Sequence, residues 1–326
     1  SILSGMQYYL PSVAWFYMGF AGLDVLYIFL FVILSLVVTA LAIILLSLLY
    51  KKINYNLLKK ATVKNKGELK YNKKSQVSSY LKLETKRYFS YPTYVLNTAF
   101  ALIFMIILPF LIKYGMFADL SGIENAEKFL QTIIPILSIS LNAMFACMCV
   151  TTSSSISIEG KQITLLKSLP IKPSKIFFTK ILFNNLLVFP FIFISGIINL
   201  ILFFYYFNIF LSLMLFIIPI IAIISFSTFG LLINLLLPKF NFDNVNQVVK
   251  QSLSLFIVLL SSMCVAIIPM VIGYSIQNLN NYIFYSIFAL IYLIIFVVSF
   301  VILKVKGDII YYKLKVWNLI INKTFA

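Results

Sequence analysis

The chain has 326 residues, of which 62% are hydrophobic and only 11% are charged, and its mean hydropathy is +1.03. Soluble domains are about half apolar and a quarter charged, so this chain has too few polar residues to cover a water-facing surface. The net charge of +17 would suit nucleic-acid binding, but the cations lie between apolar runs instead of on one hydrophilic domain, which argues against that class.

Several catalytic and binding signatures are absent from the sequence. There is no histidine, which is the most common general base and metal ligand. Cys147, Cys149 and Cys264 lie within apolar runs and have no zinc-type spacing, so we interpret them as buried thiols. No G-x-x-x-x-G-K-[ST], H-E-x-x-H or G-x-S-x-G motif occurs. We therefore expect no enzyme activity, no cofactor, no metal and no ATP site within this chain.

Seven apolar runs are long enough to cross a bilayer, which needs roughly 20 residues per helix. They are too long and too continuous for barrel strands, which would alternate over about ten residues. The predicted fold class is therefore an all-α integral membrane protein with about seven transmembrane helices. The predicted spans cover residues 25–50, 94–113, 131–152, 181–207, 209–237, 251–275 and 282–303.

The positive charges alternate with these spans. If the seven spans are right, 24 of the 26 Lys and Arg residues fall on one side of the membrane, and only Lys113 and Lys128 fall on the other. The positive-inside rule makes the basic side cytoplasmic. We therefore expect a multi-pass plasma-membrane protein with an external Ser1 and a cytoplasmic C-terminus.

The pattern also predicts how the chain is divided. No signal peptide is recognisable in residues 1–21, although the topology places Ser1 outside the cell. We therefore expect a C-terminal portion of a longer polypeptide, with a mature chain whose signal was cleaved as the alternative. Residues 1–50 would be an external aromatic segment and the last span of a preceding half, residues 51–75 a basic linker, and residues 76–326 a six-span half with a cytoplasmic tail.

Two short amphipathic segments flank the predicted spans. The sequence after Ser78 has apolar and charged faces at helical spacing and is interrupted at Pro92, as in an interfacial helix. In the predicted cytoplasmic loop at 153–180, apolar residues fall near one helical face over 158–169. Pro170 would end that helix, and Pro173 suits the first turn of the next one.

Four segments resemble bacterial ATP-binding-cassette exporter permeases of the second type. The run EGK-x4-LKSLP-x-x-P-x-K, from Glu159 to Lys175, is similar to their intracellular loop. LETKRYFSYPTYVLNT resembles their elbow helix, and LLLPKFNFDNVNQVVKQ their later cytoplasmic turn. YYLPSVAWFYMGFAG resembles the external helix before the last span of a half. The order of the four segments also fits, and the resemblance covers most of residues 76–326.

The resemblance implies a coupling helix over 158–169 that sits on a separate ATPase subunit. It also implies export of an amphipathic substrate, such as a peptide, an antibiotic or a lipid-like molecule. The alternative is that the charges only solvate a cytoplasmic helix. The residues expected to contact the ATPase are Ile158, Glu159, Lys161, Leu165, Leu166, Lys167 and Leu169.

Charged residues are nearly absent from the predicted spans, which argues against ion-coupled transport. Neutral polar residues occur there instead, and they could line a substrate path. The simpler explanation is helix packing through small and hydrogen-bonding side chains. The candidates for the path are Ser138, Asn142, Asn184 and Asn234.

Three other classes stay open. A secondary transporter or lipid flippase would show ion-dependent transport without an ATPase. A lipid-modifying membrane enzyme would need a catalytic cluster, and the lack of histidine argues against one. A non-transporting anchor or sensor would tolerate polar-to-apolar changes within its spans.

Overall fold

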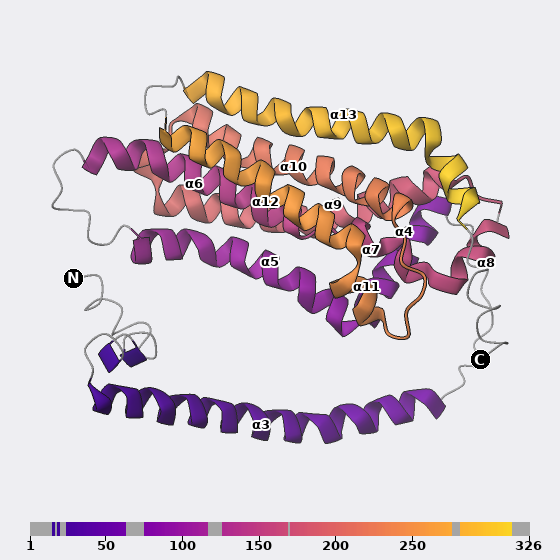
Figure 1. Cartoon of the computed structure of the whole chain (residues 1–326), viewed down its shortest axis with the longest axis horizontal. Coiled ribbons are helices and arrows are strands. Elements are labelled where there is room, and N and C mark those ends of the chain that lie inside the picture. Colours follow the sequence, from indigo (N-terminus) through magenta and orange to yellow (C-terminus); the bar gives the residue numbers. More distant parts are fainter. Residues whose placement is uncertain are drawn as a thin grey trace. The chain divides into compact units, whose positions relative to one another are not determined.

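The computed structural model describes residues 15, 16, 18, 19, 24–62, 75–116, 126–168, 170–275 and 281–314 (Figure 1). These residues are almost all helical and include no strand. The chain forms two compact units. The first comprises residues 1–73 and 114–121, and the second comprises residues 74–113 and 122–326.

The first unit contains the long helix α3, Val25–Thr62. α3 continues through the first part of the predicted linker at 51–75, as far as Thr62. Residues 51–62 contain no Pro or Gly and several Lys and Leu residues, which favour helix, so nothing in them ends α3. Residues 63–74 and most of the aromatic segment at 8–22 lie outside the described residues.

The second unit begins with the predicted interfacial helix. This helix, α4, spans Gln76–Ser90, and its buried face carries Tyr80, Glu84 and Tyr88. Tyr91 is extended, and Pro92 then opens α5, Pro92–Leu111. A proline at the first helical position loses no hydrogen bond, so this residue separates the two helices at little cost.

Six helices of the second unit, as far as the structure describes it, are long and apolar enough to cross a membrane. The protein is therefore an all-α protein of the multi-pass membrane type. The seventh predicted span lies in α3 and is not among these six helices, so the count of seven stays a prediction. The six helices are α5, α6 Ala126–Met148, α9 Pro173–Leu202, α10 Ile209–Leu236, α12 Leu253–Ser275 and α13 Asn281–Lys313.

The helix α10 forms the centre of this bundle and packs against α6, α9, α12 and α13. It is apolar around its whole circumference, as expected for a helix surrounded by other helices. A tight turn with η4, Phe204–Tyr206, joins α9 to α10. Asn208 caps α10, because its Oδ1 accepts a hydrogen bond from Leu211 N at 2.8 Å.

The chain after α6 differs most from the prediction. α6 ends at Met148, but residues 149–160 stay buried inside the bundle instead of forming an exposed loop. We call residues 149–160 the buried connector. They form the short α7, Thr152–Ser155, and most of the 3-10 helix η3, Ser157–Gln162. The six-residue helix α8, Ile163–Ser168, follows.

The predicted single helix over 158–169 is therefore wrong. Gly160 divides it, with φ of 49° and ψ of −126°. A residue with a side chain is strained in this conformation, and an added Cβ would also lie 3.2 Å from Cζ of Phe242. The backbone turns at Gly160, so η3 and α8 are separate short helices.

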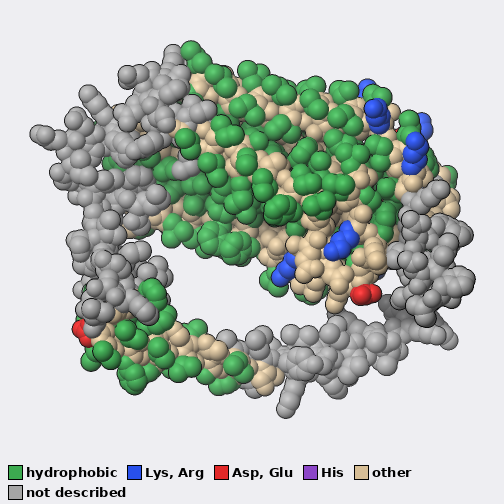
Figure 2. Space-filling model, viewed as in Figure 1, with side chains coloured by type: hydrophobic (Ala, Val, Ile, Leu, Met, Phe, Trp, Pro, Cys, Tyr) green, Lys and Arg blue, Asp and Glu red, His purple; other side chains and the backbone are tan. Residues whose placement is uncertain are grey.

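The described Lys and Arg side chains gather at one end of the bundle in Figure 2. We call this the basic end. α4, α7 and α8 lie there, together with α11, Val245–Gln251 (Figure 1). Lys113 follows the other end of α5. This distribution agrees with the charge asymmetry on which the predicted orientation depends.

Cysteine labelling tests that orientation. Phe204 in η4 is 81% exposed and Leu165 in α8 is 67% exposed, at opposite ends of the bundle. A membrane-impermeant maleimide should label Phe204→Cys in intact cells and Leu165→Cys only after permeabilisation. The wild-type chain, treated in the same way, gives the background labelling of the native Cys147, Cys149 and Cys264. The opposite pattern would reverse the topology.

Candidate functional site

The buried connector carries backbone groups that no regular helix satisfies. Irregular backbone at membrane depth is tolerated only where protein or water satisfies it. Here five consecutive hydroxyl residues, Thr151–Ser155, supply local partners. Thr152 Oγ1 donates to Ser227 O on α10, and Ser153 Oγ donates to Val150 O, both at 2.8 Å.

Asn184 on α9 holds the start of the connector. Its Oδ1 accepts hydrogen bonds from both the backbone N and the Oγ1 of Thr151, each at 2.7 Å. Its Nδ2 donates to Ser227 Oγ on α10 at 2.8 Å. This one side-chain amide therefore provides hydrogen-bond partners for the start of the connector and joins it to α9 and α10.

Asn234 on α10 holds the end of the connector in the same way. Its Oδ1 accepts hydrogen bonds from the backbone N of Ile156 at 2.8 Å and of Ser157 at 3.1 Å. Its Nδ2 lies 2.8 Å from Ser157 Oγ and 3.1 Å from Ser254 Oγ on α12. Both ends of this amide are therefore used, as a fully buried side chain requires.

The other two residues predicted for a substrate path also lie in helix contacts. Asn142 on α6 donates from Nδ2 to Ser138 O at 2.8 Å and accepts from Ser195 Oγ on α9 at 2.5 Å. None of the four predicted residues lines the surface clefts of about 310 Å³ and 650 Å³ found in the bundle. The geometry thus favours the helix-packing explanation for the three asparagines, whereas Ser138 Oγ is buried without a hydrogen-bond partner among the described residues.

A cluster of four charged side chains lies where the connector ends. Glu84 and Arg87 come from α4, Glu159 from η3 and Lys180 from α9, and each side chain is less than 10% exposed. Lys180 Nζ lies 2.7 Å from Glu84 Oε1 and 2.8 Å from Glu159 Oε1. Arg87 Nη1 lies 2.8 Å and 3.3 Å from the same two oxygens. We call these residues the buried charge cluster.

The charge cluster is electrically balanced, with two cations and two carboxylates. The third partner of the Lys180 ammonium is Ser155 O, at 3.2 Å, so all three of its donors have acceptors. Burial alone would lower the pKa of Arg87, but the Glu84 and Glu159 carboxylates outweigh it and raise that pKa. The cluster thus ties α4, the connector and α9 together through charges that have little contact with water.

Three buried oxygens beside this cluster have no hydrogen-bond partner among the described residues. They are Glu159 Oε2, Tyr80 Oη on α4 and Tyr311 Oη on α13. Both tyrosines pack in one apolar cluster with Ile156 of the connector. Burial raises the pKa of Tyr80, and the negative charge of Glu159 raises it further. The Tyr80 hydroxyl therefore stays protonated beside the carboxylate.

The predicted ATPase-contact residues are divided by the fold. Ile158 and Glu159 are 6% and 2% exposed and face the bundle interior, so they offer little surface to a partner in this arrangement. Leu166 is 6% exposed and packs in the same apolar cluster as Ile163. Leu165 is 67% exposed. The side chain of Lys161 and all of Leu169 lie outside the described residues.

Lys167 caps α13 instead of facing outward. Its Nζ donates to Leu314 O at 2.6 Å and to Tyr312 O at 3.2 Å, which are carbonyls at the end of α13. It also lies 5.6 Å from the centre of the Tyr311 ring. A cation at a helix C-terminus complements the helix dipole, while partial burial lowers the pKa of Lys167. Leu165 is thus the one predicted contact that projects outward among those whose side chains are described.

Sequence reasoning missed the charge cluster for an identifiable reason. Lys180 was counted with the loop before the fourth span, although α9 begins at Pro173 and buries it. The signal for Glu84 was present, because it lies four residues from both Tyr80 and Tyr88 and so shares their apolar face. A carboxylate on such a face needs a buried cation, which Lys180 provides.

No protein-family model, curated protein or solved structure matches this chain. The resemblance to exporter permeases therefore rests on the four sequence segments and their order.

A double-mutant cycle tests the charge cluster. Lys180→Met or Glu159→Gln alone leaves an unbalanced buried charge and should reduce the free energy of unfolding by about 3–5 kcal/mol. The double variant restores neutrality and should be more stable than the sum of the single effects predicts. Unfolding of the purified protein in detergent measures all three.

Lys175→Met is the matched control, because Lys175 lies on α9 and its Nζ makes an exposed hydrogen bond to Gln76 Oε1. It should change stability by less than about 1 kcal/mol. Strictly additive effects of Lys180→Met and Glu159→Gln would contradict a coupled cluster.

Proposed function

We propose that this chain is the membrane-spanning permease of an ATP-driven exporter and that a separate ATPase subunit docks on α8. The observation that carries this proposal is the exposed Leu165 on a short helix whose neighbours are anchored in the bundle. An isolated exposed leucine needs no explanation by itself. Leu165 is of interest because Glu159 before it is paired with α4 and α9, and Lys167 after it binds the end of α13.

Two connections would carry a movement of α8 into the bundle. On one side, only Gly160 to Gln162 separate α8 from Glu159, which pairs with Arg87 on α4 and Lys180 on α9. On the other side, Lys167 binds the last carbonyls of α13. A partner that displaces α8 would therefore act on α4, α9 and α13 together. Such a partner could bias an equilibrium between inward-open and outward-open states.

The energy source and the substrate follow from different arguments. The sequence has no phosphate-binding loop, so ATP hydrolysis would belong to the partner subunit. The substrate class, an amphipathic peptide, antibiotic or lipid-like molecule, comes from the family resemblance. In this proposal Glu159 acts inside the bundle as a link between the docking helix and α9, and Leu165 acts at the surface.

A pull-down in mild detergent tests the docking helix. The full chain should recover an ATP-binding-cassette ATPase, and Leu165→Asp should reduce that recovery about tenfold, because it places a charge in the centre of an apolar contact. Leu83→Asp places the same charge on an exposed leucine of α4, 40% exposed, and should leave recovery unchanged.

Thermal unfolding of both variants checks that the bundle stays folded. Recovery of the ATPase at the wild-type level with Leu165→Asp would refute docking through α8. Recovery of no ATPase from any of the three proteins would remove the support for an ATP-driven exporter.

The charge cluster favours a second candidate, a secondary transporter. Charged residues within the spans are more numerous than the sequence predicts, since Glu159 and Lys180 both lie in candidate spans. Buried acid–base pairs at membrane depth are typical of proton relays. Transport by the purified chain in liposomes, driven by a proton gradient without an ATPase, would favour this candidate over the exporter.

A further inference from the structure

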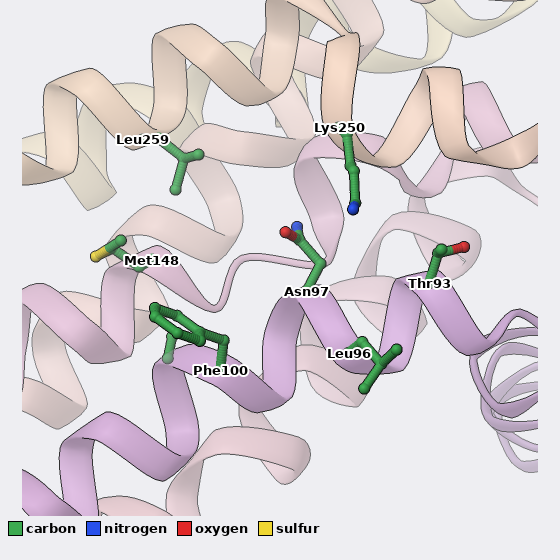
Figure 3. Close-up of a pocket in the computed structure, with 8 residues that line it drawn as sticks. Thr93, Leu96, Asn97, Phe100, Met148, Lys250 and Leu259 are labelled. Carbon is green, nitrogen blue, oxygen red and sulfur yellow. The ribbon is translucent and has the colours of Figure 1, made fainter. Parts of the chain in front are cut away.

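A surface cleft of about 310 Å³ lies between α5 and the segment formed by α11 and α12 (Figure 3). α6 packs against both α5 and α12, and Met148 at its end forms part of the cleft wall. The cleft lies at the basic end, because it is lined by the first turns of α5 and by Lys250 of α11. It belongs entirely to the second unit of the chain.

The two ends of this cleft differ in polarity. Lys250, Asn97 and Thr93 lie toward one end, together with the apolar Leu96 (Figure 3). Phe100, Met148 and Leu259 lie toward the other end, which has no polar side chain in its lining. The polar end is formed by residues near the start of α5 and the end of α11, and the apolar end lies deeper along α5 and α12. An amphipathic ligand therefore fits with its head at the start of α5 and its chain pointing along the spans.

The polar end has an uncompensated cation. Lys250 is exposed, and its Nζ has no hydrogen bond or ion pair with the described residues. The neighbouring polar groups already make some hydrogen bonds within the protein. Thr93 Oγ1 donates to Asn246 Oδ1, and Asn97 Nδ2 donates to Val249 O over a long distance of 3.5 Å. A negatively charged group next to Lys250 would gain a charge-assisted bond that the protein itself does not supply.

We propose that this cleft binds a phospholipid with an anionic headgroup from the leaflet at the basic end. The phosphate would lie against Lys250 Nζ and the Asn97 amide, and part of one acyl chain would lie along Phe100, Met148 and Leu259. The cleft is at the small end of ligand-site volumes, so it holds only part of the lipid and leaves the rest in the bilayer. Basic clusters near membrane helices attract anionic lipids in the same way.

Lipid binding is independent of the ATPase partner and of the transported substrate. It requires only that the six-helix bundle lies in a bilayer with the cleft at headgroup level. The proposed function could therefore fail while this site stands, and the reverse is equally possible.

Native mass spectrometry of the full chain in detergent tests the site with two lipids of the same acyl chains, dioleoyl phosphatidylglycerol and dioleoyl phosphatidylcholine. The wild type should bind the phosphatidylglycerol more tightly. Lys250→Gln should weaken that binding about fivefold, the effect of one lysine near a membrane surface. It should weaken phosphatidylcholine binding less, because the choline cation offsets the charge of the phosphate that both lipids carry.

Two further variants separate a defined site from general attraction. Lys306→Gln removes an exposed lysine of α13 at the same end and should not change lipid binding. Leu259→Trp fills the apolar end and should also weaken phosphatidylglycerol binding, since it displaces the acyl chain. Equal losses with Lys306→Gln and Lys250→Gln, or displacement of the lipid by millimolar inorganic phosphate, would overturn the proposal.

Discussion

The fold depends on satisfying the backbone of a broken segment that never leaves the bundle. Residues 149–160 end one span and stay buried, so their N–H and C=O groups need partners that water cannot provide. Asn184 and Asn234 provide acceptors from α9 and α10, and the hydroxyls of Ser153, Ser154 and Ser155 donate to carbonyls within the segment. The same two amides join neighbouring spans, so the position of the connector and the packing of the bundle are set together.

This constraint explains where the charges lie. Because the connector stays inside, Glu159 reaches the bundle interior and must be balanced there by Arg87 and Lys180. Gly160 then turns the backbone so that α8 lies at the surface, with Leu165 exposed and Lys167 bound to the end of α13. A surface helix and a buried charge cluster are thus separated by only a few residues, which suits the transmission of movement between a docked partner and the spans.

Composition and periodicity predicted the elements that depend on local rules. The apolar runs located the six long helices, and Pro92 and Pro173 marked helix starts correctly. The connector could not be predicted in this way, because TTSSS is typical of a hydrated loop unless partners such as Asn184 lie opposite it in the fold. The burial of Lys180 could not be predicted for a similar reason, since it depends on Glu84, almost a hundred residues earlier in the chain. Pairings between distant residues decide both cases, and a local pattern does not identify which distant residue is the partner.

Hydrogen–deuterium exchange of the purified protein tests the central claim that the connector is buried and held by side-chain caps. Peptides covering residues 151–158 should exchange as slowly as those from the middle of α10, whereas peptides covering α8 should exchange quickly. Asn234→Leu should speed exchange at Ile156 and Ser157, since both amides lose their acceptor. Rapid exchange of residues 151–158 in the wild type, at the rate of α8, would contradict this account and indicate that the segment is exposed to solvent.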